Sequence, residues 1–424
     1  MQEALTIKPL QKPIEARVVP PGSKSYTNRV LPLAALAQGE SVIEGALFSD
    51  DTKYMAQALR QLGVGVLEME AQNRFVVHGT GGHWQPSSEP LFIGNSGTSA
   101  RFLAPLVALG HSEYVIDGVP AMQKRPIAPL IEALNRLGAE VESMQGTGCP
   151  PIRIRGRGVR GGSTRIRGDI SSQYLSGLLM SAPYFEQGLR LEVEGDLVSK
   201  PYLEVTAQAM GAFGVQLELH DFERFSVAPS CYKPTVYSVE PDASAASYLF
   251  AAAAILGGRM TVPGLGKNSL QGDLGFVRVL EQMGCSIEIL DHETTVTGTG
   301  QLRGIEVNMS QISDTAQTLA AVAVFADAPT RVTGIGFIRA KETDRIGAVV
   351  RELQRLGIQA IEEADGFIIH PGQITPANVE TYDDHRMAMS FALIGLKQQG
   401  VTILDPKCTA KTFPTYWDVL EGLR

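Results

Sequence analysis

"MAQALRQLGVGVLEM", residues 55–69, decides the fold, because its pattern returns along the chain. Met55, Leu59 and Leu62 have helical spacing and predict an amphipathic helix. Gly63 suits the left-handed position just after a helix end, and an apolar, strand-like run follows it. The same order of helix, glycine and strand returns in "LIEALNRLGAEVESM" (130–144), "VTAQAMGAFGVQLEL" (205–219), "VRVLEQMGCSIEIL" (277–290) and "VVRELQRLGIQAIEE" (349–363).

The glycines that close these five copies are 70 to 76 residues apart. They are Gly63, Gly138, Gly214, Gly284 and Gly357. A sixth, imperfect copy begins at "TFPTYWDVLEGL" (412–423). A period of this size determines the architecture, so we interpret the chain as six copies of one β/α unit.

A second kind of helix is predicted between the copies, together with short strand-like runs that carry a glycine or proline turn. These helices are apolar nearly all round, which is typical of helices buried on every side. They are predicted within residues 27–39, 99–110, 171–183, 243–258, 314–326 and 385–400. The sequence therefore predicts an α/β fold with buried helices.

Six units in 424 residues suggest two lobes of three units each. The proline-containing stretches "VVPPGSK" (18–24) and "YSVEPDASA" (237–245) are the best hinge candidates. We expect one lobe from residues 1–21 and 241–424 and an inserted lobe from 22–240, with hinges near 20–22 and 239–241. Two crossings at a hinge suit a clamshell that closes over ligands.

The bulk composition excludes several classes of protein. A formal net charge of −8 disfavours nucleic acid as a partner, because such binding depends on basic patches. No apolar run approaches the ~20 residues of a membrane span, and the N-terminus lacks a signal-peptide pattern. The four cysteines and seven histidines lack disulfide-framework or metal-site spacing. We expect a cytoplasmic monomer without a membrane, nucleic-acid or metal partner.

Polar clusters stand at many of the predicted helix starts. They include "GSKSYTNR", "GNSGTSAR", "GDISSQY", "QISDTAQ", "KETDR" and "YDDHRMAM". Helix N-termini attract anions, and lysine or arginine beside nearly every start adds full charges. Any one cluster can also be read as an ordinary helix cap. A nucleotide P-loop is excluded, because Ser23 separates Gly22 from Lys24.

These motifs, taken in order, resemble those of a known family. "PGSKSYTNR", "GNSGTSAR", "KRP", "DISSQYLSGLL", "SKPYLEVT", "SDTAQT", "KETDRI", "DDHRMAM" and "DPKCTAKTFPTYW" span the whole chain. Together they resemble the EPSP synthase (3-phosphoshikimate 1-carboxyvinyltransferase) family of enolpyruvyl transferases. The resemblance implies an inside-out α/β barrel of that type, with three βαβαββ units in each of two lobes.

The resemblance also implies an activity and a set of binding residues. Members transfer the enolpyruvyl group of phosphoenolpyruvate to the 5-hydroxyl of shikimate 3-phosphate and release phosphate, without a metal or organic cofactor. The shikimate 3-phosphate contacts implied are Lys24, Ser25, Arg29, Ser171, Ser172, Gln173, Ser199, Tyr202, Asp314 and Lys341. The phosphoenolpyruvate contacts implied are Lys24, Gly97, Arg125, Gln173, Arg345, Arg386 and Lys411.

The resemblance assigns the proton transfers as well. Asp314 is implied as the base for the hydroxyl, and Glu342 as the group that handles the carbon-bound proton, with Lys24 assisting. The substrates together carry roughly five or six negative charges, which the implied cations match in number. Ser25 with Arg29, and Lys341 with Arg345, have i,i+4 spacing, so we expect each pair to share a helix face.

Three positions depart from patterns found in the family. Pro32 lies inside a predicted helix, where proline costs about 3 kcal/mol or kinks the helix. Phe102 and Phe337 stand where some members carry proline and asparagine. The family is the target of the herbicide glyphosate, and Gly97 favours sensitivity.

Two other readings compete with this one. The first is the same transfer to UDP-N-acetylglucosamine, for which relatives generally use a loop cysteine that "IDGVPAMQKRP" (116–126) lacks. The second is a non-enzymatic repeat scaffold of six similar units, such as a DNA-encircling clamp. The net charge of −8 and the acids Asp314 and Glu342 count against the scaffold.

Overall fold

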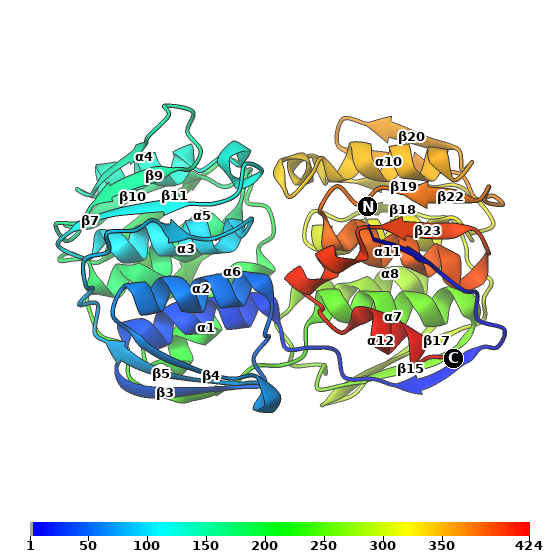
Figure 1. Ribbon diagram of the computed structural model, residues 1–424, viewed down its shortest axis with the longest axis horizontal. Coiled ribbons are helices and arrows are strands. Elements are labelled where there is room, and N and C mark those ends of the chain that lie inside the picture. Colours follow the sequence, from blue (N-terminus) through cyan, green and yellow to red (C-terminus); the bar gives the residue numbers. More distant parts are fainter. Residues whose placement is uncertain (1–2) are drawn as a thin grey trace. The chain divides into compact units, whose positions relative to one another are not determined.

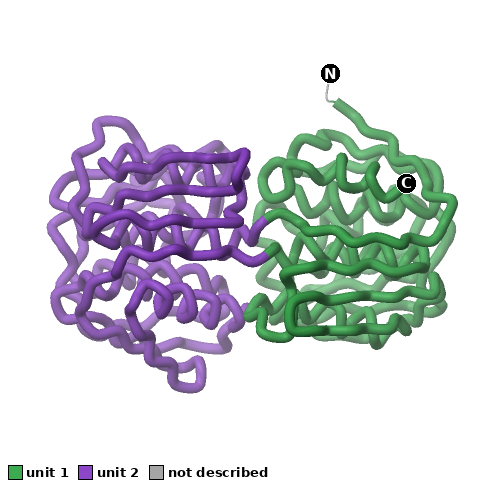
Figure 2. The backbone as a smooth tube through the Cα atoms, turned by 90° about the horizontal axis from the view of Figure 1, so that it is seen from below, with its two compact units in different colours: residues 1–21, 241–424 green, residues 22–240 purple. Residues whose placement is uncertain are grey.

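The computed structural model describes residues 3–424. Met1 and Gln2, which the expected terminal lobe includes, lie outside the described residues. The chain divides into two compact units (Figure 2): unit 1 consists of residues 1–21 and 241–424, and unit 2 of residues 22–240. Each unit contains three β-sheets and its own hydrophobic core.

The repeated glycines end helices as the sequence predicts. In the first copy, Gly63 N donates to Arg60 O at 2.9 Å and Val64 N donates to Leu59 O at 3.0 Å. This pair of bonds is the Schellman motif, which needs a left-handed residue after the helix. All five glycines have φ between 81° and 107°, and all five helix ends carry the same two bonds. The helices are α2 (Asp50–Gln61), α4 (Ala128–Arg136), α6 (Pro201–Ala212), α8 (Phe276–Gln282) and α10 (Arg345–Arg355).

Unit 2 contains three four-stranded sheets of one topology. In each, the first strand lies parallel to the second, and the other two complete an antiparallel ladder. The first sheet is β14 (Val236–Ser238), β3 (Gln38–Glu44), β5 (Arg74–Thr80) and β4 (Gly65–Met69). The second is β6 (Leu91–Phe92), β7 (Glu113–Asp117), β9 (Ile152–Arg155) and β8 (Glu140–Ser143). The third is β10 (Gly162–Arg167), β11 (Leu189–Glu194), β13 (Arg224–Val227) and β12 (Glu218–His220).

Unit 1 repeats this topology twice and varies it once. One sheet is β2 (Ile14–Arg17), β15 (Gly258–Pro263), β17 (Glu293–Gly298) and β16 (Ser286–Ile289). Another is β18 (Glu306–Asn308), β19 (Thr330–Thr333), β21 (Gly366–Ile369) and β20 (Ala360–Glu363). The third has three strands, β22 (Ala377–Val379), β23 (Val401–Leu404) and β1 (Ala4–Thr6). The imperfect sixth copy forms α12 (Tyr416–Glu421), and β1 from the other end of the chain completes its sheet.

The second kind of helix is buried, as predicted. These helices are α1 (Lys24–Leu36), α3 (Gly97–Ala108) and α5 (Ser172–Ser181) in unit 2, and α7 (Ala243–Leu256), α9 (Ala316–Ala323) and α11 (His385–Lys397) in unit 1. Within each unit they contact one another and the sheets (Figure 1). The βαβαββ unit is therefore confirmed. The described strands form six separate open sheets. In each unit, three sheets pack on the helices, and their strands do not join into one hydrogen-bonded barrel.

Interior prolines do not break these helices. α1 continues for four residues beyond Pro32, and α3 likewise contains Pro105. Pro105 frees the carbonyl of Arg101, four residues earlier, from its helical bond. A Cβ built on Gly177 of α5 would lie 2.2 Å from that carbonyl oxygen, so this glycine permits the close approach of α5 to α3. Among the described residues, every helix is too short or too polar to cross a lipid bilayer.

Candidate active site

The polar clusters act as helix caps, and they also present cations. In unit 2 the side chains of Ser23, Ser96 and Ser171 accept backbone N–H groups at the starts of α1, α3 and α5. In unit 1, Asp344 and Asp384 do the same for α10 and α11. The capping interpretation is therefore correct for the serines and aspartates. Lys24, Arg345 and Arg386 lie in the first turns of α1, α10 and α11.

Lys24 begins α1 and forms an ion pair that the sequence did not predict. Its Nζ lies 3.2 Å from Oδ2 of Asp51, which is almost fully buried in the first turn of α2. Asp51 lies in "SDDTKYM" (49–55), a stretch that is typical of a capped helix start. Ser49 and Thr52 form that capping box, which leaves Asp51 to hold the lysine.

Arg29 lies in the core of unit 2 among neutral groups. Its Nε and Nη2 donate to Thr206 Oγ1 at 2.8 Å and Ser176 Oγ at 3.2 Å. It also donates to the carbonyls of Ser25 (2.8 Å) and Tyr202 (3.2 Å). Ser25 and Arg29 both lie within α1, so this i,i+4 pair shares one helix face, as expected. Four bonds within the described chain leave one of the five guanidinium N–H groups for a ligand.

Burial gives Arg29 an unusual electrostatic state. Its side chain is 1% exposed, and desolvation lowers the pKa of its guanidinium to about 10, so it remains cationic at neutral pH. The ring of Phe102 lies 5.2 Å from its guanidinium carbon, and that of Tyr202 lies 5.7 Å away. Phe102, one of the departures from the family pattern, therefore supplies an aromatic face to this buried cation.

Gly97, the first residue of α3, lies against two arginines. A Cβ on Gly97 would be 2.2 Å from Nη1 of Arg101 and 2.6 Å from Nη2 of Arg125. Arg125 is nearly buried, and its Nη1 donates to the carbonyl of Asn95 at 2.9 Å. The absence of a side chain at Gly97 thus lets two guanidinium groups reach the start of α3, where an anion is favoured.

The remaining predicted residues of unit 2 lie at the starts of α5 and α6. Gln173 donates from Nε2 to Thr98 Oγ1 of α3 at 3.1 Å, which joins the first turns of α3 and α5. Ser172 is buried beside the cap Ser171. Ser199, with φ +56°, lies in the left-handed region just before α6, where a non-glycine residue is strained. Together with the Arg29 bonds, these contacts gather the first turns of α1, α3, α5 and α6.

Unit 1 holds a different kind of cluster, centred on Arg345. This arginine is 2% exposed and begins α10. Its Nε lies 2.8 Å from Asp384 Oδ2, and its Nη2 lies 2.8 Å from Glu342 Oε2. Its Nη1 lies 3.1 Å from Asp314 Oδ1. Burial alone would lower the pKa of Arg345, but the three carboxylates raise it above its ordinary value.

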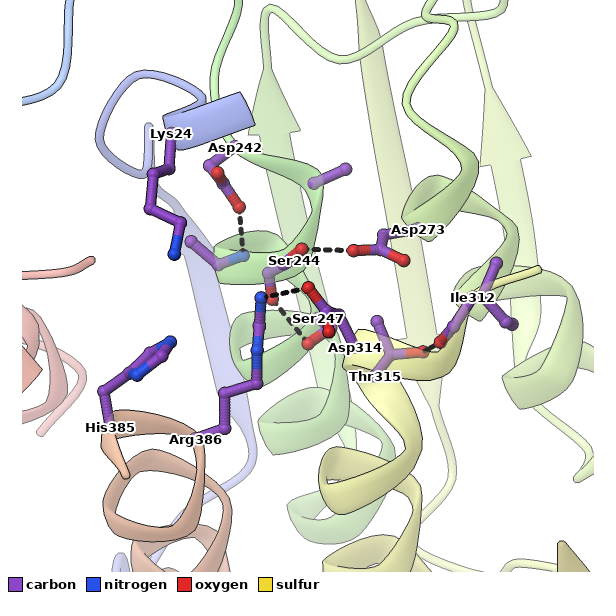
Figure 3. Close-up of polar contacts among 12 residues, drawn as sticks. Lys24, Asp242, Ser244, Ser247, Asp273, Ile312, Asp314, Thr315, His385 and Arg386 are labelled. Carbon is purple, nitrogen blue, oxygen red and sulfur yellow. Dashed lines mark hydrogen bonds and ion pairs between the residues drawn. The ribbon is translucent and has the colours of Figure 1, made fainter. Parts of the chain in front are cut away.

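Two further cations share these carboxylates. Arg386 in the first turn of α11 points toward Asp314 (Figure 3), with Nη2 2.7 Å from Oδ2. Each oxygen of Asp314 therefore meets one guanidinium. Nζ of Lys411, at the end of the 3₁₀ helix η7 (Pro406–Lys411), lies 3.4 Å from Glu342 Oε1. Opposite charges at these distances favour the ionised form of both acids.

A second acidic group lies beside this network. Asp273 in η4 (Gly272–Gly275) is almost fully buried and accepts a hydrogen bond from the hydroxyl of Ser244 (Figure 3). Burial first, and then the nearby charge of Asp314, raise the pKa of Asp273 to about 6. Asp273 was not selected from the sequence, because its loop "KNSLQGD" (267–273) belongs to none of the motifs quoted above.

One spacing argument was wrong. Lys341 and Arg345 are not on one helix face, because α10 begins only at Arg345. Lys341 instead follows η6 (Gly336–Ala340) with φ −84° and ψ −145°, which is not a helical conformation. Asp344, which lies between these two residues, is the N-cap of α10, so Lys341 stands before the helix. Phe337 packs against the core of unit 1.

Sequence reasoning also missed the main partners of two predicted cations. Asp51 pairs with Lys24, and the fully buried Asp384 pairs with Arg345. Both acids belong to motifs that were noticed, but as caps. His385 is buried, and its Nδ1 lies 3.6 Å from Asp384 Oδ1.

Comparisons with known proteins identify the family of this chain. The sequence model of the family described as EPSP synthase (3-phosphoshikimate 1-carboxyvinyltransferase) matches residues 9–420. The 3-phosphoshikimate 1-carboxyvinyltransferase of Nostoc punctiforme is 49% identical to this chain and covers 98% of both sequences. An EPSP synthase from Acinetobacter baumannii superposes with a TM-score of 0.83 at 26% identity, over 100% of this chain and 98% of that one.

A more distant structure shares the fold alone. The enolpyruvyl transferase NikO from Streptomyces tendae has a TM-score of 0.79 at 16% identity, over 100% of this chain and 98% of that one. The architecture is thus that of the enolpyruvyl transferases. Since the family model and the 49% identical relative each span nearly the whole chain, this chain belongs to the EPSP synthase (3-phosphoshikimate 1-carboxyvinyltransferase) family.

Proposed function

We propose that this chain transfers the enolpyruvyl (1-carboxyvinyl) group of phosphoenolpyruvate to the 5-hydroxyl of shikimate 3-phosphate. The products are 5-enolpyruvylshikimate 3-phosphate and phosphate, on the shikimate pathway to chorismate and the aromatic amino acids. The observation that carries the proposal is the network in unit 1. There, Asp314 and Glu342, the two acids that the reaction needs, each lie between two cations.

Asp314 is the base for the 5-hydroxyl in this proposal. Arg345 and Arg386 hold its two oxygens, which fixes the carboxylate and keeps it ionised at neutral pH. A general base must be deprotonated before it accepts the hydroxyl proton, so this pairing suits the role.

Glu342 is the acid for the methylene carbon of phosphoenolpyruvate. Without ligand its carboxylate lies 2.8 Å from Arg345 and 3.4 Å from Lys411. Anionic groups of phosphoenolpyruvate compete for these cations, which favours protonation of Glu342 and lets it donate that proton to the methylene carbon. The tetrahedral intermediate that forms is stabilised by the same cations. Glu342 then takes a proton back from the new methyl group as the C–O bond to phosphate breaks, which restores the carbon–carbon double bond and releases phosphate.

Unit 2 supplies binding groups for both substrates. We assign Ser25, Arg29, Ser171, Ser172, Ser199 and Tyr202 to shikimate 3-phosphate, together with Asp314 and Lys341 of unit 1. Gly97 and Arg125 are assigned to phosphoenolpyruvate, together with Arg345, Arg386 and Lys411. Lys24 and Gln173 are assigned to both. The buried charge of Arg29 supports this division, because its contacts in the described chain include no carboxylate.

A phosphate-release assay tests the function directly. Purified protein should release phosphate only when both shikimate 3-phosphate and phosphoenolpyruvate are present. Release from phosphoenolpyruvate alone, or with UDP-N-acetylglucosamine as the acceptor, would reject the proposal. We further propose a cytoplasmic monomer, for which light scattering should give the mass of one chain.

A further inference from the structure

The connection between β22 and α11, residues 380–384, has a strained backbone. Tyr382 and Asp383 have φ of 56° and 55°, and both lie in the left-handed region. Non-glycine residues in such conformations cost about 1–3 kcal/mol each and persist only where their surroundings enforce them. The corresponding connection between β6 and α3 uses a glycine instead, Gly94 with φ 55°. The 380–384 connection therefore needs support from its neighbours.

Helix α10 supplies that support at two points on one face. Arg345 and Glu352 are seven residues apart, which is two helical turns, so both side chains face the same side. Arg345 holds Asp384 at the end of the connection at 2.8 Å. Glu352 holds its beginning, because Oε2 accepts the N–H of Glu380 at 3.0 Å and Oε1 accepts the hydroxyl of Tyr382 at 2.6 Å.

The polar groups of Glu352 and Tyr382 have hydrogen-bond or ion-pair partners. Glu352 is fully buried, where a carboxylate is costly unless its oxygens accept hydrogen bonds. Arg355 adds an ion pair at 3.5 Å. Arg351 lies over the ring of Tyr382 at 5.6 Å and donates to its hydroxyl at 3.1 Å. Burial, and then the bond to Glu352, raise the pKa of Tyr382, so the hydroxyl remains a donor.

The connection leads directly to the candidate active site. Asp384 caps α11 by accepting the N–H of Arg386 at 2.9 Å. The position of the Arg386 guanidinium, 2.7 Å from Asp314, therefore depends on where the connection ends. Glu352 belongs to none of the site motifs, and its nearest contacts are the connection itself and Arg355.

We propose that Glu352 and Tyr382 are positioning residues, which hold the 380–384 connection in the left-handed form that places Arg386 and Asp384. Neither residue touches a reacting group. The kinetic consequence rests on the proposed function, in which Arg386 binds phosphoenolpyruvate. The structural consequence, a connection held by α10, does not depend on it.

The test compares Glu352→Gln and Tyr382→Phe with the wild-type protein. Glutamine has one acceptor oxygen, so one of the two bonds is lost while the volume is kept. We expect KM for phosphoenolpyruvate to rise about tenfold, the value of roughly one hydrogen bond, with KM for shikimate 3-phosphate changed less than twofold. Tyr382→Phe should raise KM for phosphoenolpyruvate about fivefold. The double variant should be little worse than Glu352→Gln, because the two residues share a bond.

Tyr232→Phe is the matched control. Tyr232 is a buried tyrosine of unit 2, and its hydroxyl donates to the carbonyl of Met180 at 2.7 Å. It should lower the melting temperature and leave both KM values unchanged. Glu352→Gln and Tyr382→Phe can instead behave like this control, with lower stability and unaltered KM for phosphoenolpyruvate. That result would overturn the positioning role.

Hydrogen exchange of the amides of residues 384–388 gives a readout that is independent of turnover. Loss of support should speed their exchange about tenfold in Glu352→Gln and leave it unchanged in Tyr232→Phe. A wild-type protein without turnover would reject the proposed function, and exchange would then still decide whether α10 holds the connection. Unchanged exchange in Glu352→Gln would refute the support itself.

Discussion

Two buried arginines, Arg29 in unit 2 and Arg345 in unit 1, show contrasting solutions to the same problem. Both are at most 2% exposed, Arg29 in the second turn of α1 and Arg345 at the first residue of α10. Arg29 donates to hydroxyls and carbonyls and lies near aromatic rings, and burial lowers its pKa. Arg345 contacts three carboxylates, and its pKa is raised.

The difference teaches how the two units divide the work. The charge of Arg29 is not balanced by an acid among its contacts, so in the proposed function an anionic substrate provides the balance. The charge of Arg345 is already balanced, and its acids include the two that exchange protons with substrate in the proposed reaction. The proposal therefore gives unit 2 mainly a binding role, and it gives unit 1 both binding and proton transfer. Four experiments test this contrast.

The largest expected effect is at Asp314. Asp314→Ala removes the proposed base, and such groups typically contribute about 10²–10⁴-fold to the rate. We expect kcat to fall by about that factor, while calorimetry shows that shikimate 3-phosphate still binds. Asp291→Ala, which removes an exposed acid paired with Lys267, is the control and should keep full activity. A kcat within tenfold of wild type would remove Asp314 from the role of base.

The second effect concerns stability and compares the two arginines directly. Arg345→Leu leaves the fully buried Asp384 without its cation, which costs about 3–5 kcal/mol. Arg29→Leu leaves hydroxyls that already bond to each other, Ser176 and Thr206 at 2.9 Å, so its cost should be nearer 1 kcal/mol. Urea unfolding measures both. Equal losses of unfolding free energy in the two variants would contradict the contrast between the two arginines.

The third effect is a pH dependence in unit 1. Because the pKa of Asp273 is raised to about 6 in the folded protein, the folded state binds its proton more tightly than the unfolded chain does. This contribution to stability is present below pH ~4 and is lost as the pH rises through about 6. The difference in unfolding free energy between wild type and Asp273→Asn should therefore fall by roughly 2 kcal/mol from pH 4 to 7.5. A constant difference would contradict the raised pKa.

The smallest effect is at Gly97 in unit 2. A methyl group there would lie 2.2 Å from Arg101 and 2.6 Å from Arg125, so both guanidinium groups must move. We expect Gly97→Ala to raise KM for phosphoenolpyruvate about tenfold with little change in stability, the equivalent of one displaced hydrogen bond. Gly211→Ala in α6, where a Cβ meets nothing within 4 Å, is the matched control and should leave KM unchanged.

Features with a local signal could be predicted from the sequence. The glycines at the five Schellman ends stand two residues after the last helical residue of helices with clear periodicity, so residues such as Gly63 and Gly357 identified the repeat. The buried helices were recognised because they are apolar all round. In both cases a few neighbouring residues contain the whole signal.

Features that depend on distant partners could not be predicted. The sequence around Asp51 and Asp384 indicates acids at helix starts. No pattern in the neighbouring residues shows that their carboxylates pair with Lys24 and Arg345. Likewise, β1 pairs with β23 through Leu5 and Ile403, which no periodicity connects. The error at Lys341 has a related origin, since i,i+4 spacing applies only inside a helix and Asp344 places the start of α10 later.

The pairing of β1 with β23 and of β2 with β15 also constrains how the chain is made. These two N-terminal strands leave the ribosome first, but β1 must wait for residues 401–404. At about 5–20 residues per second, that wait lasts roughly 20–80 seconds. Unit 2 needs no residue beyond 240 to complete its sheets, so it can fold during this interval. Strand β2 can pair as soon as residues 258–263 emerge, whereas β1 stays exposed to chaperones and proteases until β23 emerges.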